Sequence, residues 1–393
     1  IDPTENRDAA RFKFFNFTAR VSCADGECGH IEAALDPPAD WWNTDWTYRL
    51  PINLSVASGT TPSDYQARIV LDSGNVGSNF DWTRECNDVR ILNGTNQEEL
   101  PFWIESCSST DNNASIWVKV DKSISTAPVT VFLYYGNSIA TSNSNGANTF
   151  DFFDDFSGDL SKWDNRDAGD ISITSGYLNI GGGATGDPYG HAVLGSNTTY
   201  ESFQNGIIEG KIYLGENAIG EIGFRGDPGA NTGYKARWDN RTDYKGKNFL
   251  KPPYSDWDNL CGKDDESLDA GVWYDFKIEV NGTTFSSYTG GANQKTCTDS
   301  DYGAAGEISL QNHYGDYTRF DDIRVRKYAS PEPTASFGTE EQGTKGILPM
   351  YTGNPFYTIY QNPMNSTNRS CLADMGAGDT CDVSWIVNAT GAS

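Results

Sequence analysis

The sequence predicts an all-β protein made of several β-sandwich domains. Short alternating runs rich in Val, Ile, Thr and aromatic residues recur along its 393 residues, and Gly, Asn and Asp separate them. No segment longer than about two turns carries the 3.6-residue periodicity of an amphipathic helix. The 41 glycines and the 13% of aromatic residues suit tight turns and packed sheets. A chain of this length predicts about two to four domains.

The chain is strongly acidic, with a formal net charge of -25 at pH 7. This charge excludes nucleic acid as a partner, because phosphate binding needs clustered Lys and Arg. The three histidines, His30, His191 and His313, are too few for a histidine-rich metal centre. No apolar run is long enough to span a bilayer, so we expect no membrane span in this chain. We expect Ile1 to be a processed or trimmed start, because no signal-peptide pattern opens the sequence.

The eight cysteines fall into four close pairs, without the C-x-x-C knuckles or interleaved histidines of a zinc site. Even number and local pairing favour disulfides and therefore an oxidising, extracellular compartment at the cell surface. Other connectivities stay open, because eight cysteines allow many pairings. The nearest-neighbour bridges are Cys23–Cys28, Cys86–Cys107, Cys261–Cys297 and Cys371–Cys381.

Ten N-x-S/T triplets are glycosylation candidates of a secreted protein. A chain rich in Asn and Thr also makes such triplets by chance, but their number together with the cysteine pattern favours glycosylation. The candidates are Asn16, Asn53, Asn93, Asn113, Asn197, Asn240, Asn281, Asn365, Asn368 and Asn388.

Composition divides the chain into three parts. Residues 41–149 form a small β-sandwich that opens on aromatic residues, and residues 150–338 form a larger one. Residues 1–36 and 345–393 offer only a few strands each, and a lone hairpin is not stable in water. We therefore expect these two ends to share one immunoglobulin-like sandwich, into one loop of which the rest of the chain is inserted.

The small sandwich resembles the family of domains of unknown function numbered 2341, over residues 41–153. The motifs that carry this resemblance are Trp46-x-Tyr48-Arg49-x-Pro51-Ile52, Leu100-Pro-x-Trp103-Ile104-Glu105, Ile116-Trp-Val-Lys119 and Tyr134-Tyr-Gly-Asn137. The resemblance implies a small extracellular β-sandwich, often beside lectin-like domains, with no established chemistry.

The larger sandwich resembles the concanavalin A-like jelly-roll superfamily, and the two ends resemble repeat units of archaeal surface proteins. The jelly-roll motifs are Phe153-Asp-Asp-Phe156, Gly271-x-Trp-Tyr-x-Phe276, Gly306-x-Ile-x-Leu310 and Phe320-Asp-Asp-Ile-Arg-Val-Arg326. The end motifs are Val21-Ser-Cys-x3-Glu-Cys-Gly29 and Cys371-Leu-x2-Met-x-Ala-Gly-x-Thr-Cys381. Function carried over from a fold of this kind is analogy.

Glycoside hydrolysis is the sharpest enzyme hypothesis, because jelly rolls host endoglucanases. Such enzymes place their carboxylates on alternating strand positions, in an E-x-D pattern with a further Glu close by. Nothing in residues 150–338 fits, and Glu216 and Glu221 would point to opposite faces of a regular strand. There is also no G-x-S-x-G elbow. We expect no enzyme, although carboxylates distant in sequence could still converge.

Carbohydrate binding is the next hypothesis, since sugars stack on exposed aromatic rings and are held by polar groups. Alternation over residues 234–238 places Trp238 on one face and Arg237 on the other. With Tyr189, His191 and Arg225, these two residues could line a concave sheet. The alternative is that Trp238 belongs to the core and that the arginine side is solvated.

Calcium is the cofactor that the sequence allows, although none is required. Oxygen ligands from first and last strands commonly clamp a jelly roll, which makes Asp154, Asp155, Asp321 and Asp322 the candidate ligands. The alternative is that these carboxylates cap turns at strand ends.

The N-terminal run predicts a route to self-assembly. Phe12 and Phe14 alternate one way, and Phe15 and Phe17 alternate the other, so a break between Phe14 and Phe15 would let residues 8–14 donate a strand to a second copy. The leading hypothesis is therefore an extracellular structural subunit of a filament, sheath or surface layer. The alternative is an adhesin module that binds surface glycans, and the second alternative is a glycoside hydrolase.

Overall fold

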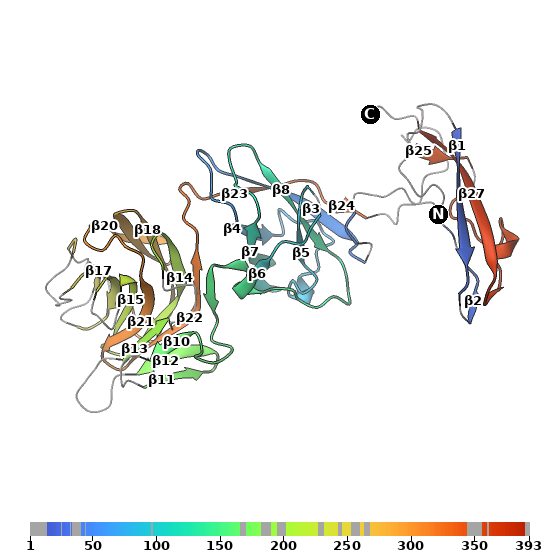
Figure 1. Cartoon of the computed structure of the whole chain (residues 1–393). Coiled ribbons are helices and arrows are strands. Elements are labelled where there is room, and N and C mark those ends of the chain that lie inside the picture. Colours follow the sequence, from blue (N-terminus) through green and yellow to red (C-terminus); the bar gives the residue numbers. More distant parts are fainter. Residues whose placement is uncertain are drawn as a thin grey trace. The chain divides into compact units, whose positions relative to one another are not determined.

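The computed structural model describes residues 14–24, 26–31, 33, 41–43, 45–95, 97–165, 170–181, 190–194, 202–226, 232–242, 246–252, 260–262, 268–343, 356–359 and 361–389. Nearly all described elements are strands, which confirms the predicted fold class (Figure 1). The chain divides into two compact units, one of residues 1–49, 134–137 and 340–393, and one of residues 50–133 and 138–339.

The two ends of the chain pair with each other. Strand β1 (Phe14–Ser22) lies antiparallel to β27 (Thr380–Ala389), which also pairs with β25 (Phe356–Thr358). The short strands β2 (Glu27–Gly29) and β26 (Met375–Gly376) pair beside them. Alternate residues of β27, among them Val383 and Trp385, are buried and pack against half-buried residues of β1. Hydrophobic alternation on the two strands therefore holds the ends together.

The pairing of β1 differs from the predicted donor strand. Phe14 pairs with Asn388 and Phe15 with Val387 in one continuous register, so the described strand has no break between these two residues. Phe14 thus belongs to a sheet of its own chain. Phe12 and the rest of residues 8–13 lie outside the described residues.

The small sandwich consists of two sheets. One has the order β23-β3-β8-β5, with β24 also paired to β3, and the other has the order β4-β7-β6. Their bounds are β3 (Tyr48–Ser55), β4 (Tyr65–Asp72), β5 (Arg90–Asn93), β6 (Phe102–Ser108), β7 (Asn113–Val120), β8 (Val129–Tyr135), β23 (Thr334–Phe337) and β24 (Glu341–Gln342). A 3-10 turn, Trp82–Arg84, and the short helix α1 (Gly146–Thr149) complete it.

Strand β23 corrects the boundary expected at residue 338. Residues 334–337, assigned from sequence to the end of the larger sandwich, pair with Ile52–Ser55 of β3 instead. The chain therefore returns to the small sandwich and adds a strand to its sheet. The alternation of Thr, Ala, Ser and Phe in this segment suits an edge strand of that kind.

The larger sandwich packs a six-stranded sheet on an eight-stranded one. The six-stranded sheet has the order β10 (Trp163–Asn165), β13 (Gly190–Leu194), β21 (Glu307–Tyr314), β15 (Ile219–Gly226), β16 (Tyr234–Asp239), β17 (Gly246–Leu250). The eight-stranded sheet has the order β11 (Ile171–Thr174), β12 (Tyr177–Gly181), β22 (Tyr317–Arg326), β14 (Gly206–Leu214), β18 (Trp273–Asn281), β19 (Thr284–Thr289), β20 (Ala292–Thr298), with β9 (Phe152–Asp154) beside β22.

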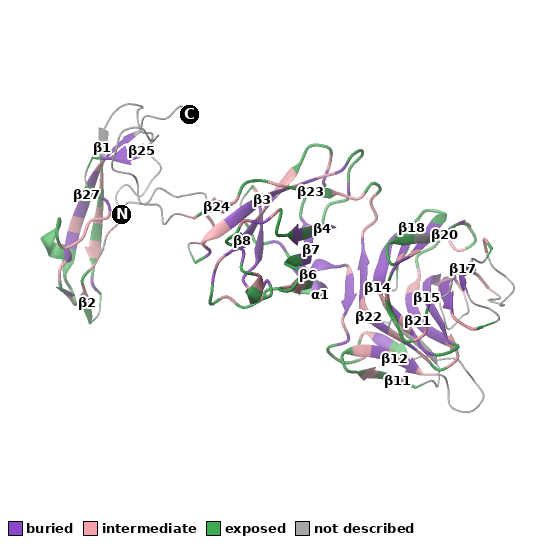
Figure 2. Cartoon of the chain, turned by 180° about the vertical axis from the view of Figure 1, so that it is seen from behind, coloured by how far each residue is buried: buried purple, intermediate pink, exposed green. Residues whose placement is uncertain are grey.

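The core of this sandwich lies between the two sheets, as the buried strands in Figure 2 show. Ile208 and Ile212 of β14 face Ile222 of β15 and Trp238 of β16 in one apolar cluster. Period-2 alternation sends the residues between them to the outer faces of the sheets. These outer faces carry the candidate sites described below.

All four nearest-neighbour disulfides are present, Cys23–Cys28, Cys86–Cys107, Cys261–Cys297 and Cys371–Cys381. Each joins residues that are close in the chain, so each restrains one local region. Within the part of the chain that the structure describes, no helix has the length and apolar character needed to cross a membrane.

Candidate functional site: the outer sheet faces of the larger sandwich

The outer face of the six-stranded sheet holds a buried cluster of charges. Glu221 of β15 accepts a hydrogen bond from the Nε atom of Arg237 of β16 at 2.6 Å and forms an ion pair with Lys235 at 3.2 Å. The Nδ1 atom of His313 lies 4.0 Å from the same carboxylate. Burial would raise the pKa of Glu221, but Arg237 and Lys235 outweigh burial and hold that pKa well below its usual range. The carboxylate therefore stays ionised and is committed to its cations.

These contacts correct the predicted carbohydrate-binding residues. Trp238 is 1% exposed and belongs to the core, as the alternative allowed. Arg237 is buried with Glu221, and Arg225 is buried with its Nε atom donating to the carbonyl of Gln204 at 2.6 Å. Paired and buried guanidinium groups cannot reach a sugar at the surface. Tyr189 lies outside the described residues, and His191 lies on β13, paired with Gln311, with its side chain outside the description.

The four candidate calcium ligands have other partners. Asp154 accepts hydrogen bonds from the indole Nε1 of Trp163 at 2.5 Å and from Lys162 at 3.2 Å. Asp155 accepts a hydrogen bond from Ser157, and the side chain of Asp322 from Lys211 at 2.5 Å.

The fourth candidate, Asp321, accepts a hydrogen bond from the backbone N–H of Asp322. Burial, and then the neighbouring charge of Asp322, raise the pKa of Asp321 to about 6. Among the described residues, no group of three or more His, Cys, Asp or Glu is placed to hold a metal ion. Calcium binding stays a prediction.

The outer face of the eight-stranded sheet carries an aromatic patch, which we define as Tyr177, Tyr213, Trp273, Tyr317 and Arg319. The register brings these residues together, because Tyr213 pairs with Arg319 on one side and with Trp273 on the other. The guanidinium carbon of Arg319 lies 4.9, 4.9 and 4.3 Å from the ring centroids of Tyr177, Tyr213 and Tyr317. One cation thus fixes three tyrosine rings.

Trp273 forms the exposed end of the aromatic patch. Its ring centroid lies 5.4 Å from that of Tyr213 and 5.7 Å from that of Tyr177, and its side chain is 37% exposed. The tyrosines of the patch are half-buried. Ring contacts and the central cation hold the patch in one arrangement, so a ligand would find it already ordered.

The same sheet face continues into a charged cleft against the small sandwich. Glu209 of β14 accepts hydrogen bonds from Arg326 at 2.8 Å and from Arg324 at 3.1 Å. Arg324 also donates to Glu105 of β6 at 2.6 Å, and Arg326 donates to the hydroxyl of Tyr65 on β4 at 3.0 Å. Charge-assisted hydrogen bonds therefore join the two sandwiches.

The carboxylate of Glu209 is ionised and paired with both arginines of this network. Burial would raise the pKa of Glu209, but the charges of Arg326 and Arg324 outweigh burial and lower it to about 2. Burial likewise raises the pKa of Tyr65, and the neighbouring Arg326 offsets part of that effect. Arg326 also lies over the ring of Trp117, with 4.8 Å between its guanidinium carbon and the ring centroid. The arginine is thus held from both sandwiches.

A cavity of about 260 Å³ opens at this network. Arg68, Glu105 and Trp117 of the small sandwich line one side, and residues of β14, β18, β19 and β22 line the other. The side chain of Arg68 is about half exposed, and Asp275 is exposed. We call this cavity the charged cleft.

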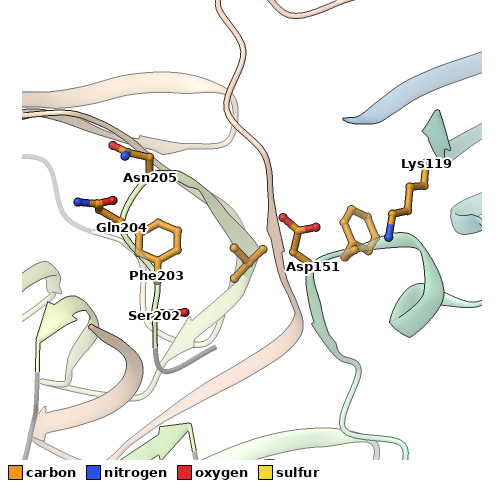
Figure 3. Close-up of a pocket in the computed structure, with 8 residues that line it drawn as sticks. Lys119, Asp151, Ser202, Phe203, Gln204 and Asn205 are labelled. Carbon is orange, nitrogen blue, oxygen red and sulfur yellow. The ribbon is translucent and has the colours of Figure 1, made fainter. Parts of the chain in front are cut away.

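A second cavity, of about 450 Å³, is lined by residues of both sandwiches (Figure 3). Its polar side chains include Lys119 and Asp151 beside the small sandwich, and Ser202, Gln204 and Asn205 of the larger one. Gln204 and Asn205 are engaged in contacts within the larger sandwich, with Gly303 and Arg225. This cavity has no exposed aromatic platform beside it among the described residues.

The predicted sequons differ in exposure. Asn93 and Asn388 are buried, and their amide groups donate to Asp121 and Tyr357. The exposed candidates are Asn16, Asn113, Asn281 and Asn368, the partly exposed ones are Asn53, Asn240 and Asn365, and Asn197 lies outside the described residues. Glycosylation stays a prediction, and exposure favours Asn16, Asn113, Asn281 and Asn368.

Sequence reasoning missed the aromatic patch, although each strand carries a signal. Tyr317 and Arg319 alternate along β22, and Tyr213 and Lys211 alternate along β14. Such alternation shows that the residues share a face, but not which strands are neighbours. The register of four strands, β12, β22, β14 and β18, is needed to assemble the patch.

Comparison with known proteins gives matches to parts of the chain. No curated protein matches it in sequence. It is similar to the carbohydrate-binding module CBM66 from Bacillus subtilis, with 18% identity over 44% of this chain and 99% of that one and a TM-score of 0.36. It is also similar to a Bacillus subtilis protein of unknown function with a galectin-like fold, with 14% identity, coverage of 45% and 94%, and a TM-score of 0.37. A Bacillus licheniformis β-glucanase matches with 13% identity, coverage of 45% and 98%, and a TM-score of 0.36.

A family model also matches part of the chain. It is described as a domain of unknown function (DUF2341) and matches residues 85–166, which confirms the resemblance predicted from sequence over the part of residues 41–153 that it covers.

Proposed function

We propose that this chain is an extracellular carbohydrate-binding protein whose aromatic patch contacts the sugar. The observation that carries the proposal is the cluster of the exposed Trp273 and three half-buried tyrosines around Arg319 on the outer face of a β-sheet. Sugar rings present apolar C–H faces that pack on aromatic rings, and hydroxyl groups that bond to neighbouring polar side chains. The patch offers both kinds of contact.

Binding without hydrolysis is the form of the proposal that the two buried glutamates, Glu221 and Glu209, favour. A retaining glycosidase needs two carboxyl groups about 5 to 5.5 Å apart, one of them with a raised pKa so that it can act as an acid. Glu221 and Glu209 both have lowered pKa values and are each held by two cations. Neither can donate a proton near neutral pH.

The extracellular location in the proposal rests on the four disulfides, which persist in oxidising compartments. Assembly into a filament, sheath or surface layer stays a prediction, since the segment expected to mediate it lies mostly outside the described residues. The immunoglobulin-like insertion and the resemblance of the ends to archaeal repeats also stay predictions.

The test is retention of the full chain on insoluble polysaccharides and in affinity gels of soluble ones. We expect at least one neutral polysaccharide to retain the protein, and Trp273→Ala to weaken that retention by about tenfold or more, the range of one well-placed aromatic contact. The exposed ring is the part of the patch that a ligand would reach first.

A matched control is Trp82→Ala, which removes a half-buried surface tryptophan of the small sandwich that packs on Phe80. This variant should keep full retention. The proposal fails if no polysaccharide retains the wild-type chain, or if Trp273→Ala and Trp82→Ala behave alike.

A further inference from the structure

The aromatic patch and the charged cleft lie on one face of one sheet. Trp273, Asp275 and Lys277 follow one another at alternate positions of β18, and Tyr213, Lys211 and Glu209 do so on β14. Because alternate residues of a strand share a face, both rows lead from the patch to the cleft. Four residues of strand separate the two ends, which is about 13 Å at 3.3 Å per residue.

We infer that the charged cleft is a second binding subsite for the same glycan, formed jointly by the two sandwiches. This inference rests on the proposed function and adds a role for the small sandwich, which would otherwise be only a spacer. A chain laid on the aromatic patch and extended along β18 reaches the cleft, whose lining includes Arg68 of the small sandwich and Asp275 and Lys277 of the larger one.

The polar groups of the cleft are arranged for hydrogen bonding rather than for stacking. Lys277 lies over the ring of Tyr288, with 4.1 Å between its Nζ atom and the ring centroid, and Arg326 lies over Trp117. Cations thus cover these aromatic faces. The carboxylate of Asp275 is exposed and has no hydrogen-bond partner within the described residues. Arg68, which is about half exposed, lines the same cavity; its Nε atom donates to Ser115 at 2.8 Å, and a terminal nitrogen lies 3.3 Å from Glu105. These groups can accept from and donate to hydroxyl groups.

The charges of the lining indicate a neutral ligand. Four cationic side chains balance four carboxylates, and therefore neither a polyanion nor a cation is attracted by the cleft as a whole. The cations are Arg68, Lys277, Arg324 and Arg326, and the carboxylates are Glu105, Glu209, Asp275 and Glu332. A polyhydroxylated chain without charge matches this balance.

Hydrogen bonds between the two sandwiches are what make a joint subsite workable. Arg324 and Arg326 bond to Glu105 and Tyr65 across the boundary, so the two walls of the cleft keep one spacing. A ligand that touches both walls then loses little additional freedom of the protein on binding. Walls that moved independently would give no such advantage.

The experiment measures affinity of the full chain for neutral oligosaccharides of glucose, xylose, mannose and fructose, from disaccharide to hexasaccharide. We expect affinity for the preferred sugar to rise about tenfold or more with length. Arg68→Ala and Asp275→Ala should remove most of that rise and leave binding of the shortest bound ligand within about twofold. Lys122→Ala, an exposed cation of the small sandwich outside the cleft, should change neither. An oligogalacturonate ladder should bind more weakly than the neutral one.

The outcomes separate the two proposals. If oligosaccharides bind and Trp273→Ala abolishes binding, but Arg68→Ala and Asp275→Ala leave the length dependence intact, the cleft is not a subsite and only this inference fails. Preference for the anionic ladder would overturn it as well. If no oligosaccharide or polysaccharide binds the wild-type chain, the proposed function and the subsite both fail. Thermal unfolding of each variant shows that lost affinity is not lost folding.

Discussion

The two sheets of the larger sandwich each contribute a tryptophan, and the two have opposite surroundings. Trp238 of the six-stranded sheet lies in the core, where its indole N–H donates to Thr289 at 3.0 Å, whereas Trp273 of the eight-stranded sheet is 37% exposed. The residues next to the two tryptophans also differ in exposure. Arg237, next to Trp238, is buried with Glu221, whereas the neighbours of Trp273 along its face are exposed or half-buried. Position on an outer face therefore does not by itself make a residue available to a ligand.

This difference teaches what each outer face can do. On the six-stranded sheet the charges of Glu221, Arg237 and Lys235 pair with one another, so they contribute to folding. On the eight-stranded sheet the ring of Trp273 is held by its neighbours, and part of its surface stays accessible to a ligand. Stability measurements and binding measurements should therefore respond to different faces.

The largest expected effect compares the two tryptophans directly. Trp238→Ala should lower the free energy of unfolding by about 3 to 5 kcal/mol, because it leaves a cavity in the core. Trp273→Ala should lower it by less than about 1 kcal/mol while weakening sugar binding. Denaturant unfolding followed by fluorescence measures both. Equal destabilisation by the two changes would contradict the assignment of Trp238 to the core and Trp273 to the surface.

The second comparison uses a charge of the buried face. Glu221→Gln leaves Arg237 and Lys235 without their anion and should destabilise the protein by about 3 kcal/mol or more, the usual cost of breaking a buried pair. Sugar retention at a temperature where the variant is folded should equal that of the wild type. Loss of retention in the folded variant would show that the six-stranded face takes part in binding.

The third comparison is pH dependence, which should arise in the charged cleft. Glu209 has a pKa of about 2 in the folded protein against an ordinary value of 4.5. A lowered carboxylate pKa contributes stability above the unfolded value, and this contribution of about 3 kcal/mol is lost as pH falls from about 4.5 through 2. Thermal unfolding of Glu209→Gln should show less acid sensitivity than the wild type. An unchanged pH profile would contradict the assignment.

The smallest expected effect is a gain in stability, in contrast to the losses expected above. Asp321 has its pKa raised to about 6, so the folded state holds a proton that the unfolded state has released between about pH 4 and 6. Stability from this group is thus lost as pH rises through that window. Asp321→Asn should stabilise the protein at pH 7 by on the order of 1 kcal/mol, since the group is only partly buried. A destabilised variant at pH 7 would indicate a required carboxylate, such as a calcium ligand.

Sequence patterns predicted those features that depend on neighbours in the chain. Alternation identified the strands and placed Trp238 and Arg237 on opposite faces of β16, and cysteine spacing gave all four disulfides. Such features need only the period of a strand or a short loop. The all-β class follows from the same local signals.

Features that depend on strand order were not predictable in this way. Glu209 and Arg326 form a hydrogen bond although they lie 117 residues apart in the chain, and Arg324 and Glu105 do so across 219 residues. Alternation also cannot tell whether the polar face of a strand will be covered, which is why Arg237 was expected at a surface and is buried. The return of β23 to the small sandwich is a further long-range pairing that composition could not indicate.

The pairing of β1 with β27 has a consequence for the order of folding. Thr18 and Ser384 of these strands bond although 366 residues separate them in the chain. The four disulfides shorten that loop only in part, because each bridges cysteines that lie 36 residues or fewer apart. Bringing the ends of so long a loop together costs about 5 kcal/mol in chain entropy. Contacts of high sequence separation form slowly, so we expect the intervening strands to fold first and this terminal sheet to close last.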